Sequence, residues 1–350
     1  MEEILDPLPY PVTFVCRYPK KWPELFSQKE DLVLNPNFFH ERVTTNEDCW
    51  TVMTYLHLKQ RRLNVHISDR FIPGEICVVS GLDFGIRDRT FSSFIVACRS
   101  DGFNPALSDF TIVQNRSQVK SETSVFIHHW PQPGLIPRFR ERGHHIKNIV
   151  FKGDVINLYE SFRSSLFCQE LDKLGVKLVI SDKPTNSAVY WNDYSEADIV
   201  LAVRDLTEKD ALVKPASKLI NAWIAGVPAL LGPEPAFRDL RLSPLDYIEV
   251  TTPEQALAAI QQLQQDPNLY KQMIANGIKR SEEFTVSCIS QQWRDVLAGP
   301  VAQKYTKWCQ RHKTSRMIEF IFKAFQQKIS IAEAEYNRKH GYHMISGKTT

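Results

Sequence analysis

The second half of the chain alternates between short apolar runs and helical segments, and this alternation constrains the fold more than any other feature. Residues 149–153 predict a strand that ends at a glycine, 158–174 predict a helix that Gly175 ends, and 176–181 predict the next strand. Further strands are predicted over 197–204, 227–231 and 247–250, with helices over 217–225 and from Thr252 onward. Because parallel strands need long crossover connections, which are usually helices, the pattern predicts a doubly wound parallel α/β sheet.

The first half is also rich in predicted strands, but their connections are shorter. One helix is predicted from Glu47 to Leu63. The segment 128–137 carries three prolines and a glycine, which exclude regular structure and predict an interdomain hinge. We therefore predict an N-terminal domain over 1–137, a second domain over 138–300 and a C-terminal helical segment over 301–350. The predicted strands of the first half are 12–17, 65–69, 76–82, 94–99, 110–114 and 125–129.

Composition and charge exclude several classes of protein. The chain has 43 Lys and Arg against 40 Asp and Glu, a net charge of +3, which is too small to indicate a nucleic-acid partner. Seven cysteines without a Cys-x-x-Cys spacing indicate neither a disulfide framework nor a zinc site. The acidic, proline-broken N-terminus is unlike a secretory signal, and the longest apolar stretch is shorter than the ~20 residues of a membrane-spanning helix. We expect a cytoplasmic protein.

The segment 204–234 contains the most specific pattern for chemistry. A helix that begins near Ser217, just beyond the carboxyl end of a parallel strand, points free backbone N–H groups at the crevice where such sheets bind ligands, and this favours phosphate. Lys214 and Lys218 are expected to add mobile positive charge there. Asn221 shares with Ser217 a helix face that can look into the crevice. The alternative interpretation is a surface helix with solvated lysines.

The run KPASKLINAWIAGVPAL, residues 214–230, resembles the donor-binding helix of GT-B-fold glycosyltransferases of the bacterial group 1 or family 4 type. The resemblance extends over most of the second half, from 151–153 through 194–200 to 266–293. It departs where many retaining members carry two glutamates eight positions apart, because the matching positions are Val213, or Lys214 with a one-residue shift, and Asn221.

The resemblance implies two Rossmann-like domains that face each other across a cleft. It also implies a metal-independent, hexosyltransferase-like enzyme that uses a nucleotide-sugar as substrate and needs no cofactor. The acceptor, which the sequence does not identify, would be a saccharide, a lipid or a small molecule. Two alternatives stay open: a nucleotide-sugar epimerase or hydrolase of the same fold, and a non-catalytic nucleotide-sugar-binding scaffold, which the missing glutamate at Asn221 favours.

The resemblance also implies roles for individual residues. Gly153 would let the backbone approach the donor phosphates, although a tight turn would equally use a glycine. Gln132 and Gly134, in the hinge, would contact the donor or simply shape the linker. Asn221 could hydrogen-bond a ribose hydroxyl through its amide. The implied donor-binding residues are Gly153, Arg204, Lys214, Ser217, Lys218, Asn221 and Glu234.

Acid–base groups are expected on loops that follow strands of the first half. An inverting transfer needs a carboxylate or an imidazole as general base, and Asp101 is the first choice, with His129 second. A retaining transfer needs no such base. A lone Asp in a turn is also a common turn former, which is the structural alternative for Asp101. Asp83 and His128 are the other groups that the pattern offers.

The C-terminal segment from about Lys304 resembles the terminal helix that crosses back to the first domain in this fold. An apolar stripe runs through 317–325, with lysines and arginines elsewhere. Packing on the first domain is the simpler interpretation. A peripheral contact with a membrane stays open, because basic amphipathic helices also bind anionic lipid.

Overall fold

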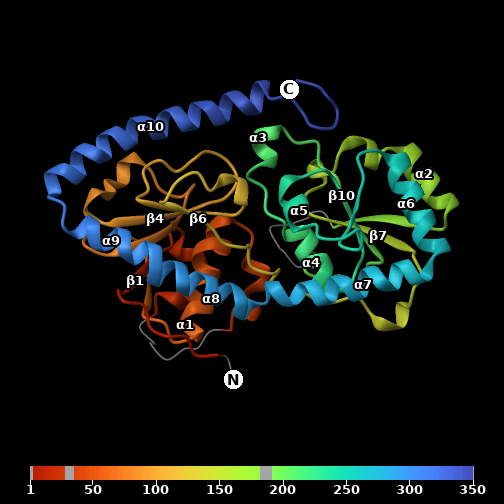
Figure 1. Cartoon of the computed structure of the whole chain (residues 1–350), viewed down its shortest axis with the longest axis horizontal. Coiled ribbons are helices and arrows are strands. Elements are labelled where there is room, and N and C mark those ends of the chain that lie inside the picture. Colours follow the sequence, from red (N-terminus) through yellow and green to blue (C-terminus); the bar gives the residue numbers. More distant parts are fainter. Residues whose placement is uncertain (1–2, 28–34, 182–190, 350) are drawn as a thin grey trace. The chain divides into compact units, whose positions relative to one another are not determined.

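The computed structural model describes residues 3–27, 35–181 and 191–349. The chain forms two compact units, each with its own parallel sheet (Figure 1). The first unit comprises Met1–Phe39, Val43–His129 and Val286–His340, and the second comprises His40–Arg42, Trp130–Thr285 and Gly341–Thr350. The predicted α/β class with two parallel sheets is confirmed. The domain boundaries at 137 and 300 stay predictions, whereas the compact units change at 129–130 and 285–286.

The sheet of the first unit has six strands in the order β2-β1-β3-β4-β5-β6, and every pairing is parallel. The first five strands lie within the predicted runs, and β6 begins one residue before the predicted range of 125–129 and ends at Phe126. The strands are β1 Val12–Val15, β2 Val65–Ser68, β3 Ile76–Ser80, β4 Phe94–Arg99, β5 Phe110–Val113 and β6 Ser124–Phe126.

Helices from both ends of the unit's sequence cover this sheet. The predicted helix near residues 47–63 is present as a π-helical turn, Asp48–Val52, that continues into α1, Met53–Gln60. Helix α8, Val286–Val296, brings Trp293 to 6.3 Å from the rings of Phe14 on β1 and of Trp50. These buried aromatic rings explain why residues after 285 belong to the first unit.

The chain stays helical through Gly299 and Pro300, at the predicted domain boundary. A π-helical turn, Leu297–Val301, contains Pro300 and joins α8 to α9, Ala302–Cys309. A wider π turn tolerates proline, because it relaxes the backbone around the missing N–H donor. Helix α10, Lys313–His340, then follows as the longest helix of the described chain.

The sheet of the second unit has five strands in the order β11-β10-β9-β7-β8, again all parallel. The chain passes from β7 outward to β8 and then returns to β9 on the other side of β7. The carboxyl ends of β7 and β9 are therefore a topological switch point, where open α/β sheets bind ligands. The strands are β7 Asn148–Lys152, β8 Lys177–Ser181, β9 Ile199–Ala202, β10 Ala229–Leu231 and β11 Ile248–Glu249.

Four of the six helices of this unit begin at a side chain that caps the helix. The Thr252 side chain accepts from the backbone N–H of Gln255 at 3.3 Å, as predicted. The helix predicted over 158–174 begins later, at Ser165. The hydroxyl of Ser164 caps it by accepting from the backbone N–H of Phe167 at 3.2 Å. The helices are α2 Ser165–Lys173, α3 Glu208–Ala211, α4 Ser217–Ala225, α5 Pro235–Leu240, α6 Pro253–Gln265 and α7 Pro267–Ser281.

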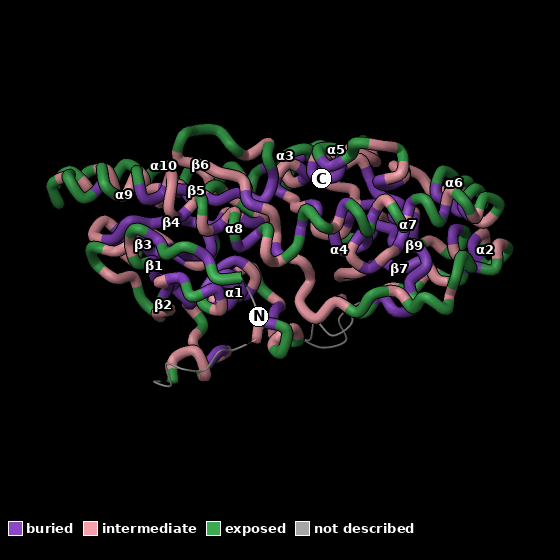
Figure 2. The backbone as a smooth tube through the Cα atoms, turned by 60° about the horizontal axis from the view of Figure 1, so that its bottom comes forward, coloured by how far each residue is buried: buried purple, intermediate pink, exposed green. Residues whose placement is uncertain are grey.

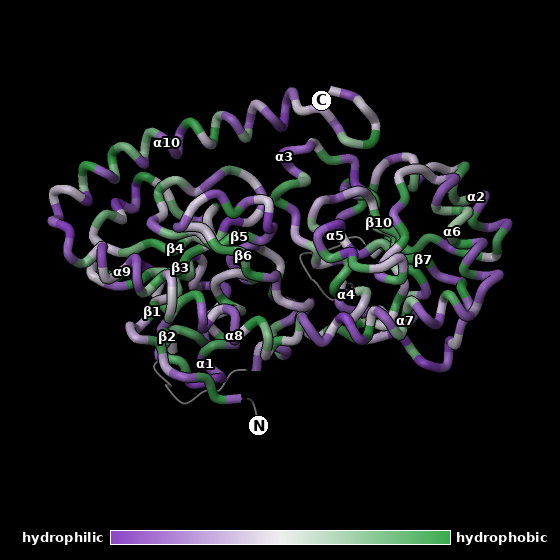
Figure 3. Tube along the Cα trace, in the orientation of Figure 1, coloured by the Kyte–Doolittle hydropathy of each residue, from purple (hydrophilic) through white to green (hydrophobic). Residues whose placement is uncertain are grey.

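The strands form the core of each unit. Figure 2 shows β4 of the first sheet and β9 of the second as buried, and every residue of β9 and β10 is buried. Figure 3 shows that these strands are also hydrophobic.

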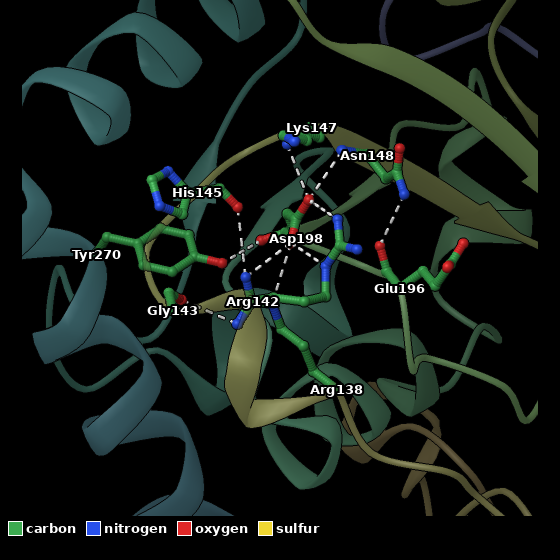
Figure 4. Close-up of polar contacts among 9 residues, drawn as sticks. All are labelled: Arg138, Arg142, Gly143, His145, Lys147, Asn148, Glu196, Asp198 and Tyr270. Atoms are coloured by element: carbon green, nitrogen blue, oxygen red, sulfur yellow. Dashed lines mark hydrogen bonds and ion pairs between the residues drawn. The ribbon is translucent and has the colours of Figure 1, made fainter.

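A buried carboxylate organises the amino edge of the second sheet (Figure 4). The Asp198 side chain, just before β9, is fully buried and accepts from Arg138 at 2.7 Å and from Arg142 at 2.6 Å. It also accepts from the backbone N–H groups of Lys147 and Asn148 at 2.8 and 2.9 Å. Burial alone would raise the pKa of Asp198, but these hydrogen bonds outweigh it and hold the pKa below its ordinary value.

Candidate functional site

The carboxyl edge of the second sheet brings together the cationic residues that the sequence singled out. The Nζ of Lys218, in the first turn of α4, donates to the carbonyl oxygen of Lys152 at the end of β7. Arg204 lies two residues beyond β9, and its charge, with that of Lys214, acts on Lys218. We call Lys152, Arg204, Lys214, Lys218 and Glu234 the carboxyl-edge cluster; four of its five members are cations.

Arg204 is held by Glu234 in a two-point ion pair. The Nε of Arg204 donates to Oε1 of Glu234 at 2.8 Å, and Nη2 donates to Oε2. The side chain of Arg204 is 11% exposed and that of Glu234 is 2% exposed, so the pair is enclosed by the protein. The planar guanidinium is fixed at the crevice by this pair, with the carboxylate occupied in holding it.

Lys218 is not the mobile lysine that we expected. The first turn of α4 lies against the end of β7, so the ammonium group sits 4.9 Å from the ring centre of Phe151 while it donates to Lys152. Burial lowers the pKa of Lys218 to about 7; Arg204 and Lys214 add to this effect, and Glu234 opposes it. The charged form of Lys218 is therefore short of negative partners.

Gly153 makes this arrangement possible. Its φ of +148° is a conformation that side-chain-bearing residues rarely adopt, and a Cβ at this position would lie 3.1 Å from the Nζ of Lys218. The predicted approach of donor phosphates to Gly153 stays a prediction. The group that approaches the glycine is the lysine ammonium.

The amino end of α4 adds backbone donors to the same edge. Its N-cap residue is Ala216, whose side chain offers no hydrogen-bond acceptor. Ser217 and Lys218 are the first helical residues, and first-turn N–H groups have no partner within a helix. A helix end of this kind favours an anion, and four cations lie beside it.

Three further predicted residues form a separate group. Asn221 is 7% exposed, and its side-chain oxygen accepts from the backbone N–H of Gln132 at 3.0 Å. Gly134, with φ +64°, packs against His40, and its carbonyl accepts from Asn192 at 2.8 Å. Asn221 therefore does not face an open crevice, because the segment 130–137 covers it. Its observed role is to hold that segment on the second unit, and the ribose contact stays a prediction.

A cavity of about 370 Å³ lies beside Arg204. The segment that follows β7 supplies Asn157, Tyr159 and Arg163 to its wall, and Lys348 of the C-terminal tail completes it. The volume is within the range of small-molecule sites. The sequence analysis did not identify Arg163 or Lys348. Arg163 could have been found as a cation in the connection that follows β7. No nearby pattern in the sequence indicates a role for Lys348.

The tail reaches this wall because Asp205 ties it down. Asp205 Oδ1 accepts from the backbone N–H groups of Ile345 and Ser346, both at 3.1 Å. His343 forms an antiparallel bridge with Thr207, and its Nδ1 lies 2.8 Å from the Asp205 carbonyl oxygen. The tail of the chain is thereby part of the second unit's carboxyl edge.

The predicted acid–base residues lie along the carboxyl edge of the first sheet. Asp101 follows β4 and accepts from the Gln114 side chain at 3.1 Å, and His129 follows β6 with its ring edge-on to Trp50 at 5.3 Å. Asp83 follows β3, and burial raises its pKa. These residues follow three strands of one parallel sheet and so share one edge.

Glu47 is a buried carboxylate at this edge that the sequence analysis did not single out. It is 1% exposed and accepts from the backbone N–H groups of Arg17 and Tyr18, directly after β1. Burial raises its pKa to about 7. Because the side chain is enclosed and serves the backbone, it positions the loop after β1. In the sequence it is indistinguishable from an acidic residue at a helix start.

No protein-family model matches this sequence, and no curated protein sequence matches it. Among solved structures the chain is similar to Anabaena Alr3699/HepE in complex with UDP and glucose, at 11% identity over 83% of this chain and 100% of that chain, TM-score 0.49. It is similar to sucrose-phosphate synthase from Thermosynechococcus elongatus, at 12% identity over 65% and 74%, TM-score 0.48. It is also similar to the pneumococcal O-GlcNAc transferase GtfA in complex with UDP and GlcNAc, at 11% identity over 71% and 60%, TM-score 0.48. The similar structures include GT-B glycosyltransferases, the family that the sequence resembles.

The described residues hold neither a cluster of metal-ligand side chains nor a helix that could span a membrane. Within 3–27, 35–181 and 191–349, no three His, Cys, Asp or Glu side chains are grouped as metal ligands would be. In the same part of the chain, every helix is too short or too polar to cross a lipid bilayer.

Proposed function

We propose that this chain is a glycosyltransferase that moves a sugar from a nucleotide-sugar donor to an acceptor. The observation that carries the proposal is the surplus of positive charge in the carboxyl-edge cluster, at the switch point of a parallel sheet. A buried lysine whose pKa is lowered to about 7 costs stability, and a bound anion would offset that cost. The sequence run 214–230 resembles the donor-binding helix of this family, which favours a nucleotide diphosphate as the anion.

In this proposal the diphosphate binds at the amino end of α4. Glu234 holds the guanidinium of Arg204, and the carbonyl oxygen of Lys152 holds the ammonium of Lys218, which Gly153 leaves room for. Both cations are therefore in place before the ligand binds. As the bond to the sugar breaks, negative charge grows on the leaving diphosphate, and fixed positive groups stabilise that transition state. A diphosphate beside Lys218 would raise the pKa of this lysine again and keep it protonated.

These same cations would replace a divalent metal ion, which is the basis for proposing a metal-independent transfer. The cavity beside Arg204, with Asn157, Tyr159 and Arg163 on its wall, would hold part of the donor. The similar structures include complexes with UDP, so uridine nucleotides are the first donors to test.

For the acceptor side we propose Asp101 as general base, with His129 as the second choice. Both lie on loops at the carboxyl edge of the first sheet, where acceptor groups would be expected. The test is the pH dependence of transfer in Asp101→Asn and His129→Gln. Activity falls at low pH when the general base becomes protonated, so loss of this acidic limb in one variant would assign the base. Unchanged profiles in both variants would contradict an inverting reaction through these residues.

The first experiment is a thermal-shift screen of the whole chain against nucleoside diphosphates and nucleotide-sugars. A ligand that binds only the folded state raises the unfolding midpoint by mass action, so we expect a selective shift. Lys218→Met should abolish most of that shift. Lys173→Met, which removes an exposed lysine of α2 in the same unit, is the matched control and should retain it.

An equal shift in wild type and Lys218→Met would place the ligand elsewhere and contradict the proposal. Incubation with the identified donor then separates the reaction classes. Transfer requires an added acceptor for rapid turnover, whereas an epimerase or hydrolase converts the donor alone. A ligand that binds tightly without turnover under either condition would identify a scaffold.

A further inference from the structure

The side of helix α10 that faces the first unit carries polar anchors as well as Phe320 and Ala324, which pack on the unit's core. Lys323 pairs with Asp109 at 2.6 Å, and the buried Gln327 accepts from the Leu107 N–H at 3.3 Å. Ser330 accepts from the backbone N–H of Asn104 at 2.8 Å. A surface helix of a soluble protein ordinarily points such residues at water and its apolar residues at the core. Helix α10 places polar anchors inward at Lys323, Gln327 and Ser330, one helix turn apart.

The outward side of α10 is apolar. Phe322 and Phe325 are each 67% exposed, and Ile321 is 61% exposed. Residues three, four and seven positions apart share one helix face, so these side chains form a single stripe. Figure 3 shows hydrophobic stretches along α10 that alternate with hydrophilic ones. The exposed stripe consists of Met317, Ile318, Ile321, Phe322, Phe325, Ile329 and Tyr336.

The charges beside the stripe are mostly positive. Lys313 and Lys328 are exposed within the same helix turns as the apolar side chains. Glu319, the acidic residue of that part, is ion-paired with Arg311 and Lys323. Over the whole helix, six Lys and Arg stand against three Glu. An apolar face flanked by lysines matches a surface that is itself apolar beneath a layer of negative charge.

We propose that α10 is a membrane-docking element that lies in the plane of an anionic lipid surface. Phe322, Phe325 and Ile321 would enter the boundary between headgroups and acyl chains. Lys313 and Lys328 can keep their ammonium groups at the phosphate level while their aliphatic stems follow the apolar face. A second copy of this chain fits less well, because the core of a protein–protein contact is depleted in lysine. The docking is independent of whether the carboxyl-edge cluster binds a nucleotide.

The test is co-sedimentation of the full chain with lipid vesicles. One set of vesicles contains phosphatidylcholine alone, and the other contains phosphatidylcholine mixed with phosphatidylglycerol. We expect binding to the mixed vesicles that weakens with added salt. The double variant Phe322→Ser/Phe325→Ser should bind about tenfold more weakly or worse, because two large apolar side chains no longer enter the lipid. Lys328→Glu should weaken binding to the mixed vesicles alone.

The matched control is Leu242→Ser/Leu166→Ser, which removes two exposed apolar side chains from the second unit and should leave vesicle binding unchanged. All replaced side chains are exposed, so each variant is expected to fold, and circular dichroism checks this. The proposal is overturned if wild type ignores mixed vesicles, if it binds both vesicle types equally, or if the Phe double variant binds like wild type. It is also overturned if wild type is a dimer in lipid-free buffer and the Phe double variant is a monomer, since a second copy would then cover the stripe.

Discussion

The two edges of the second sheet carry buried charge in opposite states. At the amino edge, Asp198 is surrounded by two guanidinium groups and two backbone N–H groups, which occupy both carboxylate oxygens. At the carboxyl edge, the charges of Arg204 and Lys214 act on Lys218 together with that of Glu234, and Glu234 is already occupied by Arg204. The same strands therefore run from a neutralised end to an end with surplus positive charge.

This difference separates structure from function within one sheet. A charge whose partners are complete stabilises the fold and has no capacity left for a ligand. A charge that lacks partners costs stability until a ligand supplies them, which is typical of functional sites. The pKa directions express the same contrast, since Asp198 is held below its ordinary value and Lys218 is also held below its own. For an acid this favours the charged form, and for a base it disfavours it.

The largest effect is expected from Asp198→Asn. Removal of the negative charge leaves Arg138 and Arg142 buried without a counter-ion, which should lower the free energy of unfolding by about 3–5 kcal/mol. Urea unfolding at neutral pH measures this change. Because the folded pKa of Asp198 is depressed, its stabilisation is present above the unfolded pKa and is lost as pH falls below about 4.

The control for this prediction is Glu170→Gln, which breaks an exposed ion pair with Lys173 on α2 and should change stability by less than about 1 kcal/mol. If Asp198→Asn were equally mild, the amino edge would not be the stabilising end of the sheet.

Gly153→Ala should give the next largest effect. The new methyl group would require an unfavourable backbone conformation and would press on the Lys218 ammonium, at a cost of about 1–3 kcal/mol. Nucleotide binding should weaken at the same time, because Lys218 is displaced. Isothermal titration calorimetry with the nucleotide found in the screen would measure the second effect.

Gly175→Ala provides the matched comparison. Its φ is +71°, but a Cβ there meets no atom within 4 Å. It should be destabilised by the backbone conformation alone, with nucleotide affinity unchanged. If both glycine variants bind nucleotide like wild type, the contact between Gly153 and Lys218 has no bearing on the ligand.

Lys218→Met should leave stability unchanged or raise it by up to about 1 kcal/mol, in contrast to Asp198→Asn. Methionine fills a similar volume next to Phe151 without the cost of a buried charge. Chemical denaturation at pH 7 tests this directly. A loss of several kcal/mol would mean that the lysine is a structural ion like Asp198, and the contrast between the two edges would fail.

A slope in stability is also expected above neutral pH. The folded state releases the Lys218 proton near pH 7, whereas the unfolded chain keeps it to about the ordinary value of 10.5. Unfolding therefore takes up a proton between these values, so the free energy of unfolding should rise with pH across this window. The slope measured between pH 7 and 9 should be larger in wild type than in Lys218→Met. Equal slopes would show that Lys218 titrates normally.

Much of the fold was predictable because its determinants are local. Apolar and β-branched runs form strands, as residues 149–152 do in the second sheet. A helix begins at Pro253 because the Thr252 side chain accepts a hydrogen bond from Gln255, three residues further on. The carboxyl-edge cluster was predictable for a related reason. Strand ends and helix starts in a parallel α/β sheet fall on one edge, so Arg204 and Lys218 are neighbours whatever the details.

The remaining features depend on partners that are remote in sequence. Asn221 is covered because it binds Gln132, 89 residues earlier, and Lys218 is immobile because its nearest acceptor is Lys152, 66 residues away. The orientation of α10 follows from Asp109, which selects Lys323 from a helix with cations on several sides. The residue pattern within one segment does not determine which of these distant contacts form.

The division of the chain into units has a consequence for its assembly. The first unit needs residues from the beginning and from 286–340, and the second needs 130–285 together with the tail after 340. Neither unit is therefore one continuous piece of sequence, and synthesis on the ribosome must pass residue 293 before Trp293 can complete the first aromatic core. Either half expressed alone would leave apolar surface uncovered. Separately expressed halves should therefore bind chaperones and be degraded by proteases.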